Sequence, residues 1–338
     1  MKVTTIKDIA RLANVSITTV SRVLNNKPDV SKNTKKRIEE IILNHDFYPN
    51  ALAKGVSQGK SNTLGLVIPY KDVFLNPFFV EVLKGVNDAA NAAGYYILLC
   101  TPKNNGESIV SIFKENRVDG IILASPRVDE NPICELIKEK VPFISTSKIP
   151  NIKGLNYVDT DSKKGTKLAV EYLISLGHIK IGFIGGPGHL ASSHDRKKSF
   201  CDTINRNELP LKDEWQADGD YLSESGYECM EKLLSLNDPP TAVFASGDIM
   251  AFGAIQCLKD KKIEIPKEIS IIGFDDVLYS GFIDPPLTTI RQYPHRKGYV
   301  AATRLIEILE GSNISRVREL LPVELVIRKS TGPLKCKD

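Results

Sequence analysis

The chain has 338 residues, too many for one typical domain and enough to bury sizeable cores. Hydrophobic residues make up 42% and charged residues 25%, and there is no low-complexity tract and no stretch long enough to span a membrane. Residues 1–60 hold eleven Lys/Arg and five Asp/Glu, a net charge of +6, whereas the remainder holds 34 basic and 36 acidic residues. A basic terminal module on a near-neutral body predicts a polyanionic partner, although charge alone fits a solvated basic face equally well.

The six cysteines are scattered and include no CxxC pair, which indicates reduced thiols rather than a metal site. The opening residues, MKVTTIKDIA, contain no apolar signal-peptide region. We therefore expect a cytoplasmic protein without a membrane partner.

Three short helical patterns follow one another in residues 1–48. Thr5 starts the first with a capping-box-like pattern, Ser16 caps the second and Ser31 opens the third. Asn14 lies where the chain must turn sharply between the first two, a conformation that Asn tolerates. The inward apolar positions are Ile6, Ile9, Ala10 and Ala13, then Val20, Val23 and Leu24, then Ile38, Ile41 and Ile42. Two helices joined by a tight turn and braced by a third are the helix-turn-helix design.

The outward face of the second helix is suited to a DNA major groove. Arg22 can bond a guanine edge, and the methyl groups of Ile17 and Thr18 can contact thymine methyls. The predicted DNA-contacting residues of this module are Thr5, Ser16, Ile17, Thr18, Thr19, Ser21, Arg22, Asn25 and Ser31. The alternative is a small three-helix bundle that binds protein or nothing, which the basic charge disfavours.

Residues 61–338 alternate short apolar runs with amphipathic stretches. The predicted strands are TLGLVI, YYILLC, DGIIL, PFIST, KIGFIG, TAVFA and ISIIGF, and the predicted helices lie near 78–93, 107–116, 131–139, 163–176, 192–206, 223–236 and 247–260. This rhythm predicts parallel sheets covered by helices on both faces. Two such series predict two doubly wound subdomains, with a ligand crevice at the carboxyl ends of the strands.

One motif is typical of nucleotide enzymes. Residues 186–191, GPGHLA, match G-x-G-x-x-A after a predicted strand. However, we expect no strand ending in an acidic residue about 20 residues later, because residues 209–215 have the pattern of a loop. Pro187 also removes a backbone donor that a phosphate would need. There is no P-loop, HExxH or G-x-S-x-G motif, so we expect no cofactor, no metal and no catalytic residue.

Ordered motifs run along nearly the whole chain: TIKDIARLANVSITTVSRVLNN, VSKNTKKRIEEII, YPNALA, NPFF, RVDGIIL, LGHIKIGFIGGP, SGDIMAFGA, ISIIGFDD and PPLTTIRQ. In these motifs the chain resembles the lactose-repressor family of bacterial regulators. The resemblance implies an all-α helix-turn-helix headpiece (1–48), a hinge (49–60) and an α/β core (61–338). The core would resemble a periplasmic binding protein, with one subdomain of residues 61–160 and 291–321 and a second of 161–290 and 322–338.

The resemblance also implies an effector site in the crevice. Arg196 matches an arginine that binds hydroxyl or carboxylate groups, and Asp275 matches an acceptor for vicinal hydroxyls. The full set of predicted effector-binding residues is Asn76, Phe78, Arg196, Tyr221, Asp275 and Gln292. One departure is Gly247, which replaces an Asn of the family pattern and removes an amide contact. The chain ends without a heptad tail, so the resemblance implies a homodimer on a pseudo-palindromic operator rather than a tetramer.

Residues 48–60, YPNALAKGVSQGK, have two interpretations. A plain tether is one. In the other, the family implies a marginal helix that folds in the operator's minor groove, with contacts from Asn50, Ala53 and Val56. Val56 replaces the leucine that usually supplies the wedge.

The leading hypothesis is therefore a repressor that binds double-stranded operator DNA and a small-molecule effector, with a sugar or sugar acid as the favoured class. A purine-like effector is compatible with Arg196 and Asp275. A sugar-binding transport protein and an enzyme on the same fold are the alternatives. The basic module argues against the first, and the lack of a catalytic constellation argues against the second.

Overall fold

The computed structural model describes residues 5–25, 27–48, 59–68, 76–101, 109–124, 131–149, 152–312 and 316–334. Two compact units divide the chain, Met1–Ser61 and Asn62–Asp338. Each is treated below by itself.

The first unit contains α1 (Ile6–Leu12), α2 (Ile17–Leu24) and α3 (Lys32–Asn44). The side chains predicted to start these helices do so: Thr5 forms a capping box with Asp8, and Ser16 and Ser31 accept hydrogen bonds from backbone N–H groups at 3.1 and 3.2 Å. Asn14 turns the chain with φ of 50°. The predicted apolar positions form one core, in which Ile9, Val20 and Ile38 are fully buried. The helix-turn-helix prediction is confirmed.

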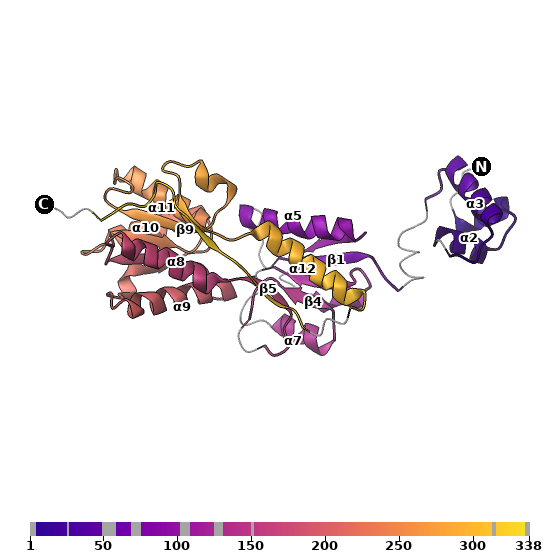
Figure 1. The fold of residues 1–338 in the computed structure, drawn as a ribbon, viewed down its shortest axis with the longest axis horizontal. Coiled ribbons are helices and arrows are strands. Elements are labelled where there is room, and N and C mark those ends of the chain that lie inside the picture. Colours follow the sequence, from indigo (N-terminus) through magenta and orange to yellow (C-terminus); the bar gives the residue numbers. More distant parts are fainter. Residues whose placement is uncertain are drawn as a thin grey trace. The chain divides into compact units, whose positions relative to one another are not determined.

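The second unit contains two sheets of parallel strands, seen with their helices in Figure 1. In the first sheet, six strands of the described residues lie in the order β11-β5-β4-β3-β1-β2. Their bounds are β1 (Thr63–Val67), β2 (Tyr96–Cys100), β3 (Gly120–Leu123), β4 (Phe143–Ser145), β5 (Tyr157–Thr160) and β11 (Arg318–Leu321). Helices α5 (Pro77–Ala92) and α12 (Pro294–Leu309) pack on one face, and α6 (Ile109–Lys114) and α7 (Asn131–Lys138) on the other.

In the second sheet, six strands of the described ranges lie in the order β12-β10-β9-β8-β6-β7, with only the β10–β12 pair antiparallel among these pairings. Their bounds are β6 (Ile181–Gly185), β7 (Gln216–Asp218), β8 (Ala242–Ala245), β9 (Ser270–Asp275), β10 (Thr288–Arg291) and β12 (Glu324–Val326). One face carries α10 (Ser223–Leu234) and α11 (Asp248–Asp260), and the other carries α8 (Ser162–Ser175) and α9 (Ala191–Arg206). The predicted α/β core of two doubly wound sheets is confirmed.

The chain passes between the two sheets after β5, after β10 and after β11. The second passage leads into α12, which lies against α5 (Figure 1). Two glycines permit this close helix contact: a Cβ at Gly85 would lie 1.9 Å from the His295 carbonyl oxygen, and one at Gly298 would lie 2.1 Å from the Val82 carbonyl oxygen. The second and third turns of α5 are thereby held against the first two turns of α12, and the first turn of each helix carries residues of the cavity described below.

Candidate ligand-binding site and nucleic-acid interface

The outward side of α2 forms a shallow concave surface. It is lined by Ile17, Thr18, Ser21, Arg22, Asn25 and Lys27. The first five were predicted from the sequence, and Lys27 was missed because it follows the helix rather than lying on its periodic face. Ile17 is exposed, which is unusual for isoleucine in a helix of a small domain and leaves an apolar group for a partner.

Arg22 is bonded to Asp29 in this structure. Its guanidinium donates to the Asp29 carboxylate, and both side chains are about half exposed. The same hydrogen bond holds the pKa of Asp29 below its ordinary value. Exposed ion pairs contribute little to stability, so a nucleic-acid acceptor could replace Asp29 as the partner of Arg22.

The other predicted DNA contacts divide into two groups. Thr5, Ser16 and Ser31 use their hydroxyl groups as helix caps, and Thr19 shares a hydroxyl–hydroxyl bond of 2.9 Å with Ser16. The predicted hinge contacts Asn50, Ala53 and Val56 lie outside the described residues.

One cavity in the second unit brings together all six predicted effector residues. Its lining consists of Asn76, Phe78, Phe79, Ser147, Ser162, Ser192, Arg196, Tyr221, Asp275, Gln292 and Lys297. The lining comes from elements of both sheets, at the carboxyl ends of their strands. The space open to water is about 30 Å³, room for about two water molecules.

Arg196 and Asp275 form the charged centre of this cavity. Arg196 lies in the second turn of α9, Asp275 ends β9, and both are about 5% exposed. Arg196 Nη2 is 3.8 Å from Asp275 Oδ1, Nη1 donates to the Ser246 carbonyl, and the guanidinium carbon is 3.8 Å from the centre of the Phe274 ring. Among the described residues, Arg196 Nε has no hydrogen-bond partner. The guanidinium is therefore fixed in place without all its donors being used.

Burial destabilises the ionised form of Asp275, and the neighbouring side chains offset only part of this effect. Burial raises the pKa of its carboxyl group to about 7, and the charge of Arg196 opposes the rise. The nearby Asp248 raises the pKa further, whereas a hydrogen bond from Gln292 Nε2 lowers it. A carboxylate in this state is a strong acceptor for hydroxyl groups that bring it new hydrogen bonds.

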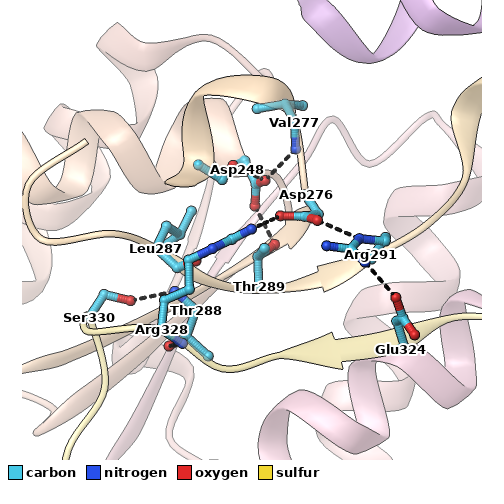
Figure 2. Close-up of polar contacts among 11 residues, drawn as sticks. Asp248, Asp276, Val277, Leu287, Thr288, Thr289, Arg291, Glu324, Arg328 and Ser330 are labelled. Atoms are coloured by element: carbon cyan, nitrogen blue, oxygen red, sulfur yellow. Dashed lines mark hydrogen bonds and ion pairs between the residues drawn. The ribbon is translucent and has the colours of Figure 1, made fainter. Parts of the chain in front are cut away.

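The loop after β9 places Asp275 through strained backbone. Asp275 and Asp276 have φ angles of 130° and 55°, conformations that non-glycine residues adopt at a cost. Figure 2 shows what holds them: the Asp276 carboxylate accepts from Arg291 Nε at 2.6 Å and from Arg328 Nη2 at 2.7 Å. Arg291 ends β10, whereas Arg328 follows β12 and lies beside Leu287 and Thr288 at the start of β10, so the loop cannot relax without breaking two charge-assisted bonds from different segments.

Asp248 supports the same loop from the other side (Figure 2). It is fully buried at the start of α11 and accepts from the Val277 N–H at 3.0 Å, from the Ser280 hydroxyl at 2.6 Å and from the Thr289 hydroxyl. Burial raises its pKa. We attribute a structural role to this carboxylate, because all its bonds go to the protein. Neither Asp248 nor Asp276 was singled out from the sequence, since burial and partners decide their roles.

Tyr221 packs against two glycines. Its ring would lie 2.3 Å from a Cβ at Gly186 and 3.0 Å from a Cβ at Gly247, and its hydroxyl bonds the Ser193 hydroxyl at 2.7 Å. The first glycine of the G-x-G-x-x-A motif therefore makes room for an aromatic ring.

The structure corrects one part of the argument about that motif. Residues 213–215 form a 3-10 helix, and β7 follows and ends in the acidic Asp218. Residues 209–212 are irregular, as expected for a loop, but the strand just beyond residues 209–215 was not predicted, because a three-residue edge strand has no apolar run to reveal it. Asp218 lies 30 positions after Gly188 and bonds Lys197 Nζ at 3.0 Å.

The side chains of the remaining predicted residues already make hydrogen bonds or contacts within the protein. Asn76 caps α5, accepting from the Phe78 N–H at 3.0 Å, so only its amide N–H₂ is available to a ligand. Phe78 contacts Phe79 edge to face. Gln292 donates to Asp275 and thus orients it. Sequence reasoning missed Lys297 and the three cavity serines, because the tertiary placement of α12 and the loops decides whether these side chains point into the cavity.

Within the described ranges, no group of three or more His, Cys, Asp or Glu side chains is placed to hold a metal. No helix in the described part of the chain has the length and apolarity to cross a membrane.

A helix-turn-helix unit joined to a two-sheet core with a cavity at the strand ends defines a class, the DNA-binding transcription regulators with a periplasmic-binding-protein-like core. Comparison with known proteins gives the family. Residues 5–50 match the model for bacterial regulatory proteins of the lacI family, and residues 170–331 match a periplasmic binding protein-like domain. The chain is 35% identical over 333 residues to the probable HTH-type transcriptional repressor ExuR of Bacillus subtilis (strain 168), covering 98% of this chain and 99% of the relative.

Solved structures of transcription regulators also match the chain. A lac repressor dimer bound to operator and the anti-inducer ONPF matches with a TM-score of 0.87 and 28% identity, over 97% of this chain and 99% of that one. The transcriptional regulator CelR in complex with cellobiose matches with a TM-score of 0.76 and 26% identity, over 96% and 99%. The chain belongs to the lacI family, whose members bind operator DNA and small-molecule effectors and form dimers. It is a transcriptional repressor of that family and not an enzyme.

Proposed function

We propose that the chain is an effector-controlled repressor whose effector is a polyhydroxylated, sugar-type molecule bound between the two sheets of the core. The observation that carries this proposal is the buried Arg196–Asp275 pair at a cavity with aromatic and hydroxyl lining. An arginine with an unused donor and a carboxylate with raised pKa complement the hydroxyl groups of a sugar. Phe78 and Tyr221 offer apolar faces to the ring.

The other lining residues have smaller roles in this proposal. Asn76 donates from its free amide nitrogen, and Gln292 keeps Asp275 oriented. The cavity is lined by residues of both sheets, so a bound sugar would contact both and would favour one separation of the two walls over another. Two such separations would give the core two states that a ligand can favour differently.

The proposed division of labour follows the chain. Residues 1–48 bind the operator through the outward side of α2, residues 49–60 act as a hinge, and residues 61–338 bind the effector and a second copy of the chain. We place the protein in the cytoplasm, where its operator DNA lies. Arg22 reads a guanine after leaving Asp29, while hydroxyl groups of the helix caps and Thr19 contact phosphates.

The test measures operator binding with and without candidate effectors. Fluorescence anisotropy with a labelled operator should show a shift in affinity with at least one sugar or sugar acid of a panel that also contains purines, and a response to purines alone would contradict the proposed ligand class. Asp275→Ala or Arg196→Ala should abolish that shift, while the operator affinity without effector stays near wild type, because the α2 face lies in the other unit. Asp218→Ala serves as a control, since this exposed carboxylate lies outside the cavity lining. A normal effector response in the Asp275 variant would show that the cavity is not the effector site.

A further inference from the structure

Lys297 is a buried cation on the cavity wall that the Arg196–Asp275 pair does not explain. It lies in the first turn of α12 and is 6% exposed. Its Nζ donates to Asp159 Oδ1 at 3.0 Å. The close contact of Gly298 with α5 fixes the helix, so Lys297 cannot swing away with it.

Asp159 holds the Lys297 ammonium in one direction. This carboxylate lies in β5, where Oδ2 accepts from the Lys148 N–H at 2.8 Å and Oδ1 accepts from the Thr160 N–H at 2.7 Å. Two backbone donors therefore anchor the carboxylate independently of the lysine. An ammonium has three N–H donors. Within the described residues, the Asp159 carboxylate takes the one bond of Nζ, which leaves donors for a molecule in the cavity.

Stability does not account for the Lys297–Asp159 pair. Burying two charges costs more than an apolar pair of the same size, and replacement of such pairs by hydrophobic residues is often neutral or stabilising. The position of the charge on the cavity wall points instead to a ligand.

We propose that Lys297 binds a carboxylate of the effector, so that the effector is a sugar acid rather than a neutral sugar. This inference rests on the proposed function and narrows its ligand class. Arg196 faces the cavity from the second sheet and Lys297 from the first, against a single lining carboxylate, Asp275. Each cation already has a carboxylate neighbour, Asp159 beside Lys297 and Asp275 beside Arg196, so a ligand carboxylate would be held by the N–H donors that these cations have left and would link the two walls.

A carboxylate fits this place better than a phosphate. Asp159 and Asp275 lie on either side of the two cations, and both repel a dianion more strongly than a monoanion. Phosphate sites in proteins usually supply several arginines or a helix N-terminus with free N–H groups. Here one lysine and one arginine, each beside a carboxylate, would bind the anion.

The experiment is calorimetric titration of the full chain with D-glucuronate, D-galacturonate and D-gluconate, beside D-glucose, D-galactose and glucose 1-phosphate. We expect at least one acid to bind at least 10-fold more tightly than the neutral sugars and the phosphate. Lys297→Met should weaken that acid by 10-fold or more, and Lys297→Arg should retain more of the affinity than Met. Arg304→Met is the matched control, because Arg304 is also an ion-paired cation on α12 but lies outside the cavity lining.

The outcomes separate this inference from the function it rests on. If a neutral sugar binds and no acid does so, the carboxylate assignment is wrong while the proposed function stands. Preferred binding of glucose 1-phosphate would likewise overturn the carboxylate. Wild-type affinity of Lys297→Met for the acid would remove Lys297 from the site. If no molecule of the panel binds, both the inference and the proposed ligand class fail. Circular dichroism and the melting temperature of both Lys297 variants establish that they are folded.

Discussion

Replacing Asp275 with asparagine should stabilise the ligand-free protein above neutral pH. The pKa of this carboxyl group is about 7 in the folded protein, against 3.8 for an ordinary aspartate. The difference is about three pKa units, and each unit corresponds to about 1.36 kcal/mol between the two protonation states. The substitution can therefore raise the free energy of unfolding by at most about 4 kcal/mol. Local rearrangement around the ionised group reduces this gain, so we expect an increase of about 1–3 kcal/mol.

The sign follows from proton binding. Between about pH 4 and pH 7 the folded protein keeps the proton on Asp275, whereas the unfolded chain has lost it. The folded state binds more protons in this window, so its stability falls as pH rises and the loss is complete above pH 7. Asparagine does not ionise, and it keeps an acceptor for the Gln292 amide. Asp275→Asn should thus match the wild type near pH 4 and exceed its free energy of unfolding at pH 8.

Urea unfolding of both proteins at pH 4.5 and pH 8 measures this difference. Asp248 also has a raised pKa and repels the ionised Asp275, so the measured difference includes the relief of this repulsion, which has the same sign. Asp218→Asn is the control for loss of an ion-paired carboxylate, because Asp218 is exposed and bonds Lys197. An Asp275→Asn protein that is no more stable than wild type at pH 8 would show that Arg196 fully compensates the buried charge. The same variant should lose its effector response, because the carboxylate that destabilises the ligand-free protein is also the group proposed to bind the effector.

Three further predictions concern other parts of the molecule. Arg22→Ala should weaken operator binding by about 1–3 kcal/mol and relax the preference at one base pair. Lys7→Ala should instead weaken binding to all duplexes alike and flatten its salt dependence. Equal losses of affinity for operator and random DNA in Arg22→Ala would contradict base reading. Gly186→Ala should lower stability by about 1–3 kcal/mol in thermal melts, because its Cβ would lie 2.3 Å from the Tyr221 ring, and an unchanged melting temperature would mean that the ring moves freely. Gly55→Ala should tighten operator binding and blunt the effector response, and Val56→Gly should weaken operator binding beyond its effect on random DNA; two variants that bind like wild type would make this segment a tether.

Features set by short stretches of sequence could be predicted closely. Thr5, Ser16 and Ser31 each cap a helix through bonds within three residues, so their patterns alone locate α1, α2 and α3. Buried parallel strands have continuous apolar runs, and seven of them were identified in this way. Five further strands were not predicted from this pattern: β5, β7, β10, β11 and β12. All are short and contain polar residues, and the QAD of β7, for example, has no apolar run.

Features set by distant partners could not be predicted from local pattern. The bond of Arg22 to Asp29 joins a helix to the following loop, and nothing in the spacing indicates it. The sequence pattern around Lys297 is that of a solvated lysine in an amphipathic helix. The packing of α12 on α5 places it at the cavity, where it bonds Asp159, a residue 138 positions earlier in the chain. The family pattern supplied Arg196 and Asp275, but not the loop contacts that hold them.

The glycine at position 247 shows how the cavity compensates for a lost contact. A Cβ there would lie 3.0 Å from Tyr221 Cδ1 and 3.7 Å from Asp275 Oδ2, so a longer amide side chain would occupy the space between the ring and the carboxylate. With glycine, Tyr221 takes that space, and its own backbone adopts a φ of 70° to do so. An apolar face thus replaces an amide beside Asp275. The carboxylate then has a hydrogen bond from Gln292 and the charge of Arg196 at 3.8 Å, which offset its burial only in part, in agreement with its raised pKa and with the proposed hydroxyl-rich effector.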